Sequence, residues 1–133
     1  MLPPGSSVGA ITLFVEDVGT SRTFYAEVFD RPVVYEDESS VVFRFDNTLV
    51  NLLAVPAAHE LVDPGVVGGA DAGLRFQLTV WVDDTDAVCA ELASRGVALL
   101  NGPLDRPWGQ RTASFVDPSG HLWEIAQEIA ATA

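Results

Sequence analysis

Two stretches of alternating hydrophobic and polar residues resemble each other along the chain. Residues 10–16 read AITLFVE and residues 77–83 read QLTVWVD, with aliphatic side chains at every second position. Successive side chains of a strand point to opposite faces of a sheet, so each stretch predicts a strand with one aliphatic face. The opposite face mixes polar with aromatic side chains, as the wall of a binding site does. We call this second face the mixed face.

A helical pattern follows each predicted strand. The turns at residues 17–20 and 83–85 carry acidic and hydroxyl side chains that can cap a helix N-terminus. Apolar residues then recur at helical spacing, at Phe24, Tyr25, Val28 and Phe29 in the first helix and at Val88, Cys89, Leu92 and Ala93 in the second. The two halves of the chain therefore carry the same strand–helix pattern.

Three further strands are predicted after each helix. In the first half they are residues 31–38, 41–45 and 48–55. In the second half they are residues 97–100, 110–116 and 121–127, and the segment NGPLDRPWG before the second of these is predicted as a loop. The order of elements is βαβββ in both halves, which predicts an α+β fold of two such modules with mostly antiparallel, mixed sheets.

The predicted modules span residues 8–55 and 74–128 of a single domain, residues 1–133. Residues 56–73 between them are rich in Gly, Pro and Ala, which predicts a linker loop with a helical turn near His59. The chain length agrees with one domain, because domains commonly hold about 100–200 residues.

Composition and charge argue against several classes of partner. Hydrophobic residues make up 48% of the chain, yet no apolar run reaches the ~18–20 residues of a membrane span. The N-terminal residues MLPPGSS show no secretory signal pattern, so we expect a cytoplasmic protein without a membrane partner. The net charge of −12 argues against nucleic acid and favours cationic small molecules.

Three segments of the chain carry a resemblance to a known family. They are LFVEDVGTSRTFYAEVF at residues 13–29, LTVWVDDTDAVCAELASRG at residues 78–96 and RPWGQRTASFVDPSGHLWEIAQ at residues 106–127. With these segments the sequence resembles the vicinal oxygen chelate superfamily, the glyoxalase, bleomycin-resistance and extradiol-dioxygenase group. The resemblance implies that each module curls into half of a cup and that the mixed faces line one cavity.

Metal-using members of that family hold their ion with His or Glu side chains from the first and fourth strands of each module. The resemblance places these four positions at Ala10, Asn51, Gln77 and Glu124. Only the last is ionisable, and alanine and neutral amides are poor ligands for transition metals. We therefore expect no metal and no other cofactor at this site. A ligand role for His59, from a loop folded over the cavity, remains an alternative.

The mixed faces predict a site for a small organic molecule that is aromatic or cationic. The candidate ligand-binding residues are Phe14, Asn51, Gln77, Trp81, Trp108, Arg111 and Glu124. Aromatic walls with a few polar groups suit such a molecule, and the resemblance implies binding of the antibiotic-resistance type. Trp108 in a Pro-Trp-Gly loop is expected to cap the cavity or plug a sheet edge. Arg111 shares strand parity with Ala113 and Phe115, so it faces either the cavity or the surface.

Several alternatives to metal-free binding remain open. Burial of Glu124 among apolar residues would favour a general base, as in a lyase or isomerase of the same superfamily. A non-standard metal site would favour a lyase, isomerase or dioxygenase, and an interaction module without a ligand is a further possibility. Sheet edges tend to be paired or covered, and pairing of two chains is common in the family, so we expect a homodimer.

Overall fold

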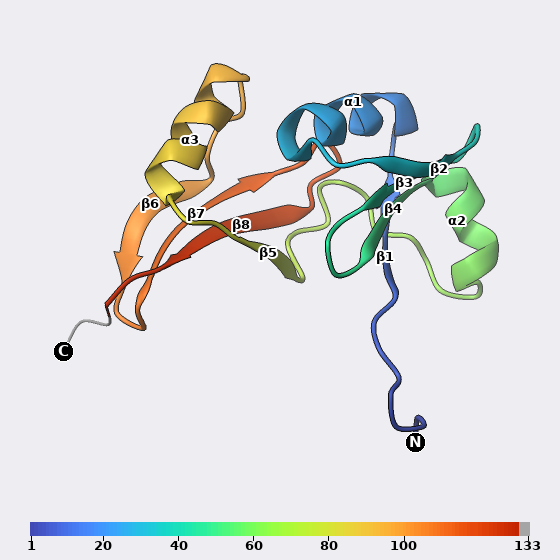
Figure 1. Ribbon diagram of the computed structural model, residues 1–133. Helices are drawn as coiled ribbons and strands as arrows, with labels where there is room; N and C mark the ends of the chain where they lie inside the picture. The colour runs from blue at the N-terminus through green and yellow to red at the C-terminus, as the bar shows by residue number, and fades with distance from the viewer. Residues whose placement is uncertain (131–133) are drawn as a thin grey trace. The chain divides into compact units, whose positions relative to one another are not determined.

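The computed structural model describes residues 1–130 and divides into two compact units, Met1–Gly69 and Ala70–Ala133. Each unit contains one four-stranded sheet with helical segments beside it (Figure 1). The strand order is β1-β4-β3-β2 in the first unit and β5-β8-β7-β6 in the second. The first and last strands of each module pair in parallel, and the other neighbours are antiparallel. The predicted α+β fold of two βαβββ modules is therefore confirmed.

The first unit begins with β1 and ends after a short helix. Its elements are β1 (Ala10–Val15), α1 (Val18–Phe29), β2 (Val33–Glu36), β3 (Ser40–Arg44), β4 (Leu49–Ala54) and α2 (Val55–Val62). The elements of the second unit are β5 (Gln77–Trp81), α3 (Thr85–Ser94), β6 (Asn101–Arg106), β7 (Gln110–Val116) and β8 (Leu122–Glu128).

An aspartate caps the main helix of each module. The backbone N–H of Thr20 donates to the Asp17 carboxylate at 2.9 Å at the start of α1. The backbone N–H of Ala87 donates to the Asp84 carboxylate at 3.1 Å at the start of α3. These bonds satisfy N–H groups that have no partner inside the helix. Asp30 ends α1 in a left-handed conformation with φ 49°, which an aspartate tolerates better than most residues.

Each helix covers the aliphatic face of its own sheet. In the first unit the core consists of Leu13, Val15, Tyr25, Val41, Phe43, Val50 and Leu52, all at most 2% exposed. In the second unit Phe115, Trp123 and Ile125 are buried with Cys89 and Leu92 of α3. Burial raises the pKa of the Cys89 thiol, with a further contribution from the negative charge of Asp86. The thiol therefore acts as an apolar core group, as its helical spacing predicts.

The edge strand β6 differs from the prediction. Residues 97–100, predicted as a strand, precede it, and β6 runs through residues 101–106, predicted as a loop. Gly102 has φ 88°, Pro103 has no N–H to donate, and the register shifts between Asn101 and Leu104. These features signal a turn in sequence, but an edge strand tolerates both proline and a bulge.

The segment predicted as a linker loop begins with a helix. α2 occupies residues 55–62, two turns rather than the single turn expected near His59. Pro56 stands in the first turn, where a missing N–H costs nothing, and Ala58 is fully buried. The rest of residues 56–73 forms turns and irregular chain. Neither α2 nor any other helix within residues 1–130 has the length and apolar character that crossing a membrane requires.

Candidate functional site

A row of polar side chains crosses the mixed face of the second sheet. Thr79 lies opposite Glu124, Glu124 lies opposite Ser114, and Ser114 lies opposite Asn101. Residues paired directly across strands share one face of a sheet, so this row joins all four strands. Gln77 and Trp81 lie on the same face of β5, on either side of Thr79. The face predicted from strand parity is therefore present, with Gln77, Trp81 and Glu124 on it.

Glu124 is held in place by a single hydrogen bond. The hydroxyl of Thr79 donates to its Oε1 at 3.0 Å, and the side chain is half-buried between Leu122 and Ala126 on the same face. Its other oxygen has no hydrogen-bond partner among the described residues. The carboxylate is therefore oriented on one side and able to accept a bond from a ligand on the other.

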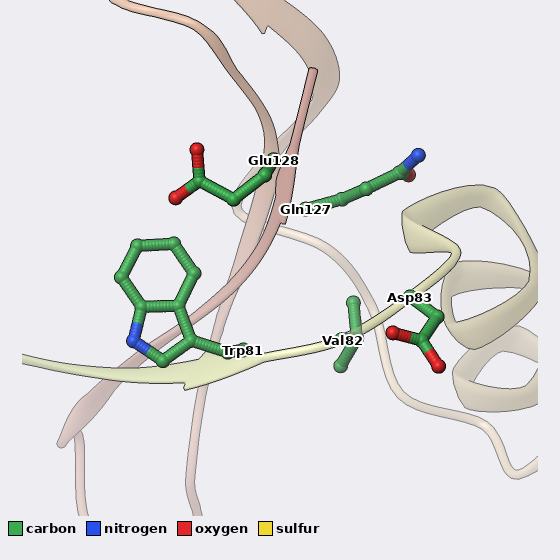
Figure 2. Close-up of a pocket in the computed structure, with 5 residues that line it drawn as sticks. All are labelled: Trp81, Val82, Asp83, Gln127 and Glu128. Atoms are coloured by element: carbon green, nitrogen blue, oxygen red, sulfur yellow. The ribbon is translucent and has the colours of Figure 1, made fainter.

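A pocket of about 300 Å³ opens at the carboxyl ends of β5 and β8. It is lined by Trp81, Val82, Asp83, Gln127 and Glu128 (Figure 2). Figure 2 shows the Trp81 indole and the Glu128 carboxylate on the same side, with the Gln127 amide pointing away from them. The indole is 60% exposed. An accessible aromatic ring beside a carboxylate is an arrangement that attracts an organic cation.

The wall of this pocket is tied to the start of α3. The backbone N–H of Thr85 donates to the Gln127 side-chain oxygen at 2.9 Å, and the Thr85 hydroxyl donates to the backbone oxygen of Arg111 at 2.8 Å. Thr85 is fully buried. These bonds join α3 to β7 and β8, so the pocket is supported by regular elements rather than by a free loop.

Arg111 lies on the helix-covered face of the second sheet. It pairs opposite Gln127 in register with buried Ala113 and Phe115, and its guanidinium bonds to Asp86 at 3.0 Å and to Asp105 at 2.9 Å. The Asp105 and Asp86 carboxylates raise the pKa of this guanidinium. The structure therefore does not place Arg111 beside Glu124, and its predicted contact with a ligand stays a prediction.

Trp108 lies in the turn between β6 and β7 and is 64% exposed. Its indole N–H donates to the side-chain oxygen of Gln110 at 3.2 Å. Gln110 pairs opposite Glu128 and so shares the mixed face, but Trp108 is not among the residues that line the pocket. Its predicted role as a cap stays a prediction.

The first unit repeats the arrangement with an amide in place of the carboxylate. Asn51 lies opposite Thr12, as Glu124 lies opposite Thr79. The Asn51 amide nitrogen is 3.5 Å from the Thr12 hydroxyl, and its buried oxygen has no hydrogen-bond partner within residues 1–130. Phe14 lies on the same face, two residues from Thr12. The structure thus brings Phe14 and Asn51 together on the first sheet.

The donor set does not fit a divalent metal. On the first sheet Ala10 offers no donor and Asn51 offers a neutral amide; on the second sheet Gln77 offers another amide and Glu124 the single carboxylate. Transition metals in such sites require imidazole nitrogen or carboxylate oxygen. Within residues 1–130 no three His, Cys, Asp or Glu side chains are grouped so as to hold one ion. His59 lies exposed on α2.

Two polar residues of the mixed face were not predicted as site residues from the sequence. Glu128 lies on β8 two residues after Ala126 and lines the pocket. The sequence had indicated only Glu124 as a candidate carboxylate on this strand. Arg106 lies on β6, opposite Gln110. Its position was predicted to lie within the loop of residues 101–109, where strand parity has no meaning. A bulge at Gly102 and Pro103 would have had to be recognised first.

Comparison with known proteins agrees with this architecture. The uncharacterized protein YraH of Bacillus subtilis (strain 168) is 32% identical over 119 residues, which cover 86% of this chain and 93% of that protein. A glyoxalase/bleomycin resistance protein/dioxygenase from Nocardioides has a TM-score of 0.85 at 18% identity, over 98% of this chain and 89% of that chain. TnmS3, an antibiotic binding protein from Streptomyces sp. CB03234, has a TM-score of 0.72 at 26% identity, over 96% and 99%.

A match over most of the chain shows the family to which it belongs. The model of the Glyoxalase/Bleomycin resistance protein/Dioxygenase superfamily matches residues 7–125, which include both modules and the three segments that carry the resemblance in sequence. From this match, the two βαβββ modules and the 32% identical relative, the chain belongs to the Glyoxalase/Bleomycin resistance protein/Dioxygenase superfamily.

Proposed function

We propose that the protein binds a small organic molecule of the antibiotic type without a metal, on the mixed face of the second sheet, which carries Trp81 and Glu124. The observation that carries the proposal is the mixed face of the second sheet. There an indole that is 60% exposed lies on the same face as the oriented carboxylate of Glu124. The resemblance implies metal-ligand positions at Glu124 and Gln77, and Gln77 supplies only an amide. Such a face can bind and orient an aromatic molecule, but it has no set of groups for metal chemistry.

The charges around the pocket favour a ligand with a cationic group. Glu128 and Asp83 line the pocket with Trp81, and the chain has a net charge of −12. A cation over an indole gains roughly 0.5–2 kcal/mol, more when water is excluded. The antibiotic-binding TnmS3, at 26% identity over nearly its whole length, supports the same class of function.

The same proposal includes a cytoplasmic homodimer. The strands β2 and β6 end their sheets, and unpaired strand edges tend to be covered by a partner. Light scattering coupled to size-exclusion chromatography should give twice the chain mass of 14.2 kDa. A mass of one chain at micromolar protein would contradict this part of the proposal.

We expect Trp81→Ala to weaken binding of an aromatic probe about 10-fold, because the contact between the indole and the ring of the probe is worth about 1–1.5 kcal/mol. A suitable probe is 2-(2-naphthyl)ethylamine, which joins a flat ring to a cation, and its affinity can be measured by isothermal titration calorimetry. Trp108→Ala is the matched control, since that indole is equally exposed but lies outside the pocket. Equal losses in both variants, or none in either, would contradict the proposal, as would a stoichiometric metal found by elemental analysis of the purified protein.

The variant Glu124→Gln distinguishes a binding protein from an enzyme that uses Glu124 as a general base. The amide keeps an oxygen that can accept the Thr79 hydroxyl at the observed 3.0 Å but loses the negative charge, so we expect the affinity for the cationic naphthyl probe to fall by no more than about 10-fold. Removal of a general base would instead lower a reaction rate by about 10²–10⁴-fold. Turnover is measured by mass spectrometry of any molecule that copurifies with the protein, before and after that molecule is incubated with the protein. A turnover that is lost in Glu124→Gln would favour the lyase or isomerase alternative.

A further inference from the structure

Arg106 is a half-buried cation on the mixed face of the second sheet. Its Nε–H donates to the Thr112 hydroxyl at 2.9 Å, and its Nη2–H donates to the Asn101 side-chain oxygen at 2.9 Å. Thr112 is 1% exposed and lies on β7, opposite Ala126. The guanidinium therefore lies across β6 and β7, next to the polar row that contains Ser114 and Glu124.

The partners of Arg106 are both neutral. Most other arginines pair with carboxylates: Arg22 with Glu36, Arg31 with Asp46, Arg95 with Glu91, and Arg111 with Asp86 and Asp105. No carboxylate within residues 1–130 forms an ion pair with Arg106. A fixed guanidinium without a counter-charge still has N–H groups to donate, and its planar fork matches a carboxylate.

From this arrangement, and resting on the proposed function, we infer that the ligand carries an anionic oxygen group of the carboxylate class, which Arg106 binds. Two neutral hydrogen bonds hold the guanidinium in place, so little side-chain freedom remains to be lost on binding. The overall negative charge does not prevent this, because exposed charges more than about 10 Å away are largely screened at 0.1 M salt.

The same face then carries two groups of opposite charge, Arg106 and Glu124, at separate places. Arg106 donates to Asn101, which lies in the same cross-strand row as Ser114 and Glu124. In that row β6 and β8 are two strands apart, about 10 Å at the usual strand spacing. A ligand that spans this distance presents its anionic group to β6 and β7 and its cationic or N–H group to β8 and β5. The inferred ligand is thus an aromatic molecule with charges of both signs rather than a simple cation.

The test compares two isosteric probes, 2-naphthylacetate and 2-naphthylacetamide, which differ in charge but share ring and shape. We expect the wild-type protein to bind the acetate at least 10-fold more tightly than the acetamide in isothermal titration calorimetry. Arg106→Gln should remove this preference, lowering the acetate affinity far more than the acetamide affinity. Arg75→Gln is the matched control, because it makes the same change in net charge at an exposed position of the same unit and should keep the preference.

The outcomes distinguish this inference from the proposed function. If the acetamide binds and the acetate binds no more tightly, or if Arg75→Gln abolishes the preference as well, the inference is wrong and the proposed function stands. If neither of these probes nor 2-(2-naphthyl)ethylamine binds, both are overturned. Should Arg106→Gln fail to fold, the side-chain Nε–H resonance of Arg106 in the wild-type protein decides: it should shift with the acetate, and an unchanged resonance at saturation overturns the inference.

Discussion

Replacing Tyr25 by alanine should lower the free energy of unfolding by about 3–5 kcal/mol, because a buried aromatic ring is lost and a cavity remains. Tyr25 is fully buried at the centre of α1. Its ring lies 5.8 Å from that of Phe24, 5.2 Å from that of Phe29 and 6.0 Å from that of Phe43. The loss therefore removes a contact by which α1 packs on β3. Urea unfolding monitored by circular dichroism measures it.

Thr23→Ala provides the control on the same helix. Thr23 is exposed, so its replacement should change the free energy of unfolding by less than about 0.5 kcal/mol. Tyr25→Phe keeps the ring and should retain most of the stability. A loss below about 1 kcal/mol in Tyr25→Ala would mean that the ring contributes little packing energy, contrary to the geometry of the aromatic cluster.

The periodicity of the sequence predicted the elements that bury a continuous apolar face. Tyr25 and Cys89 were assigned to packed helix faces from their spacing alone, and both are buried. Asn51 and Glu124 were assigned to mixed faces by strand parity, and they lie there, opposite Thr12 and Thr79. These features are predictable because burial of one face requires a regular period in the sequence.

The edge strand β6 was not predictable in the same way. It buries little apolar surface, and its sequence NGPLDR carries the residues of a turn. Its place in the sheet depends on pairing with β7 through a shifted register, which the local pattern of residues does not report. Arg106, the cation of the candidate site, was missed for this reason, and the roles proposed for the site residues remain predictions.

Strand parity alone also left the face of Arg111 undecided. The sequence alternates polar Thr112 and Ser114 with apolar Ala113 and Phe115, but all four are buried in the structure, so burial does not distinguish the two faces of β7. The orientation follows from two ion pairs with Asp86 on α3 and Asp105 on β6. The pair with Asp86 joins segments that are distant in the sequence, and strand parity does not report such contacts.

Replacing Asp117 by alanine should lower the free energy of unfolding by about 3 kcal/mol, since buried N–H donors lose their acceptor at about 1–3 kcal/mol each. The Asp117 side chain is fully buried. It accepts the backbone N–H groups of Ser119 and His121, each at 2.9 Å, and the ring Nδ1 of His121 lies 2.9 Å from its Oδ2. These bonds close the turn that leads from β7 into β8.

Asp117→Asn separates the backbone bonds from the bond to the histidine ring. Its side-chain oxygen can still accept both backbone N–H groups, so we expect a loss of about half that of the alanine variant. Because β8 carries Glu124 and Glu128, a loosened turn should also weaken binding of the naphthyl probes in Asp117→Ala more than in Asp117→Asn. Equal stability of both variants and the wild-type protein, measured by urea unfolding, would show that the turn forms without these bonds. The register of β8, and with it the position of the candidate site, would then have to be fixed by strand pairing alone.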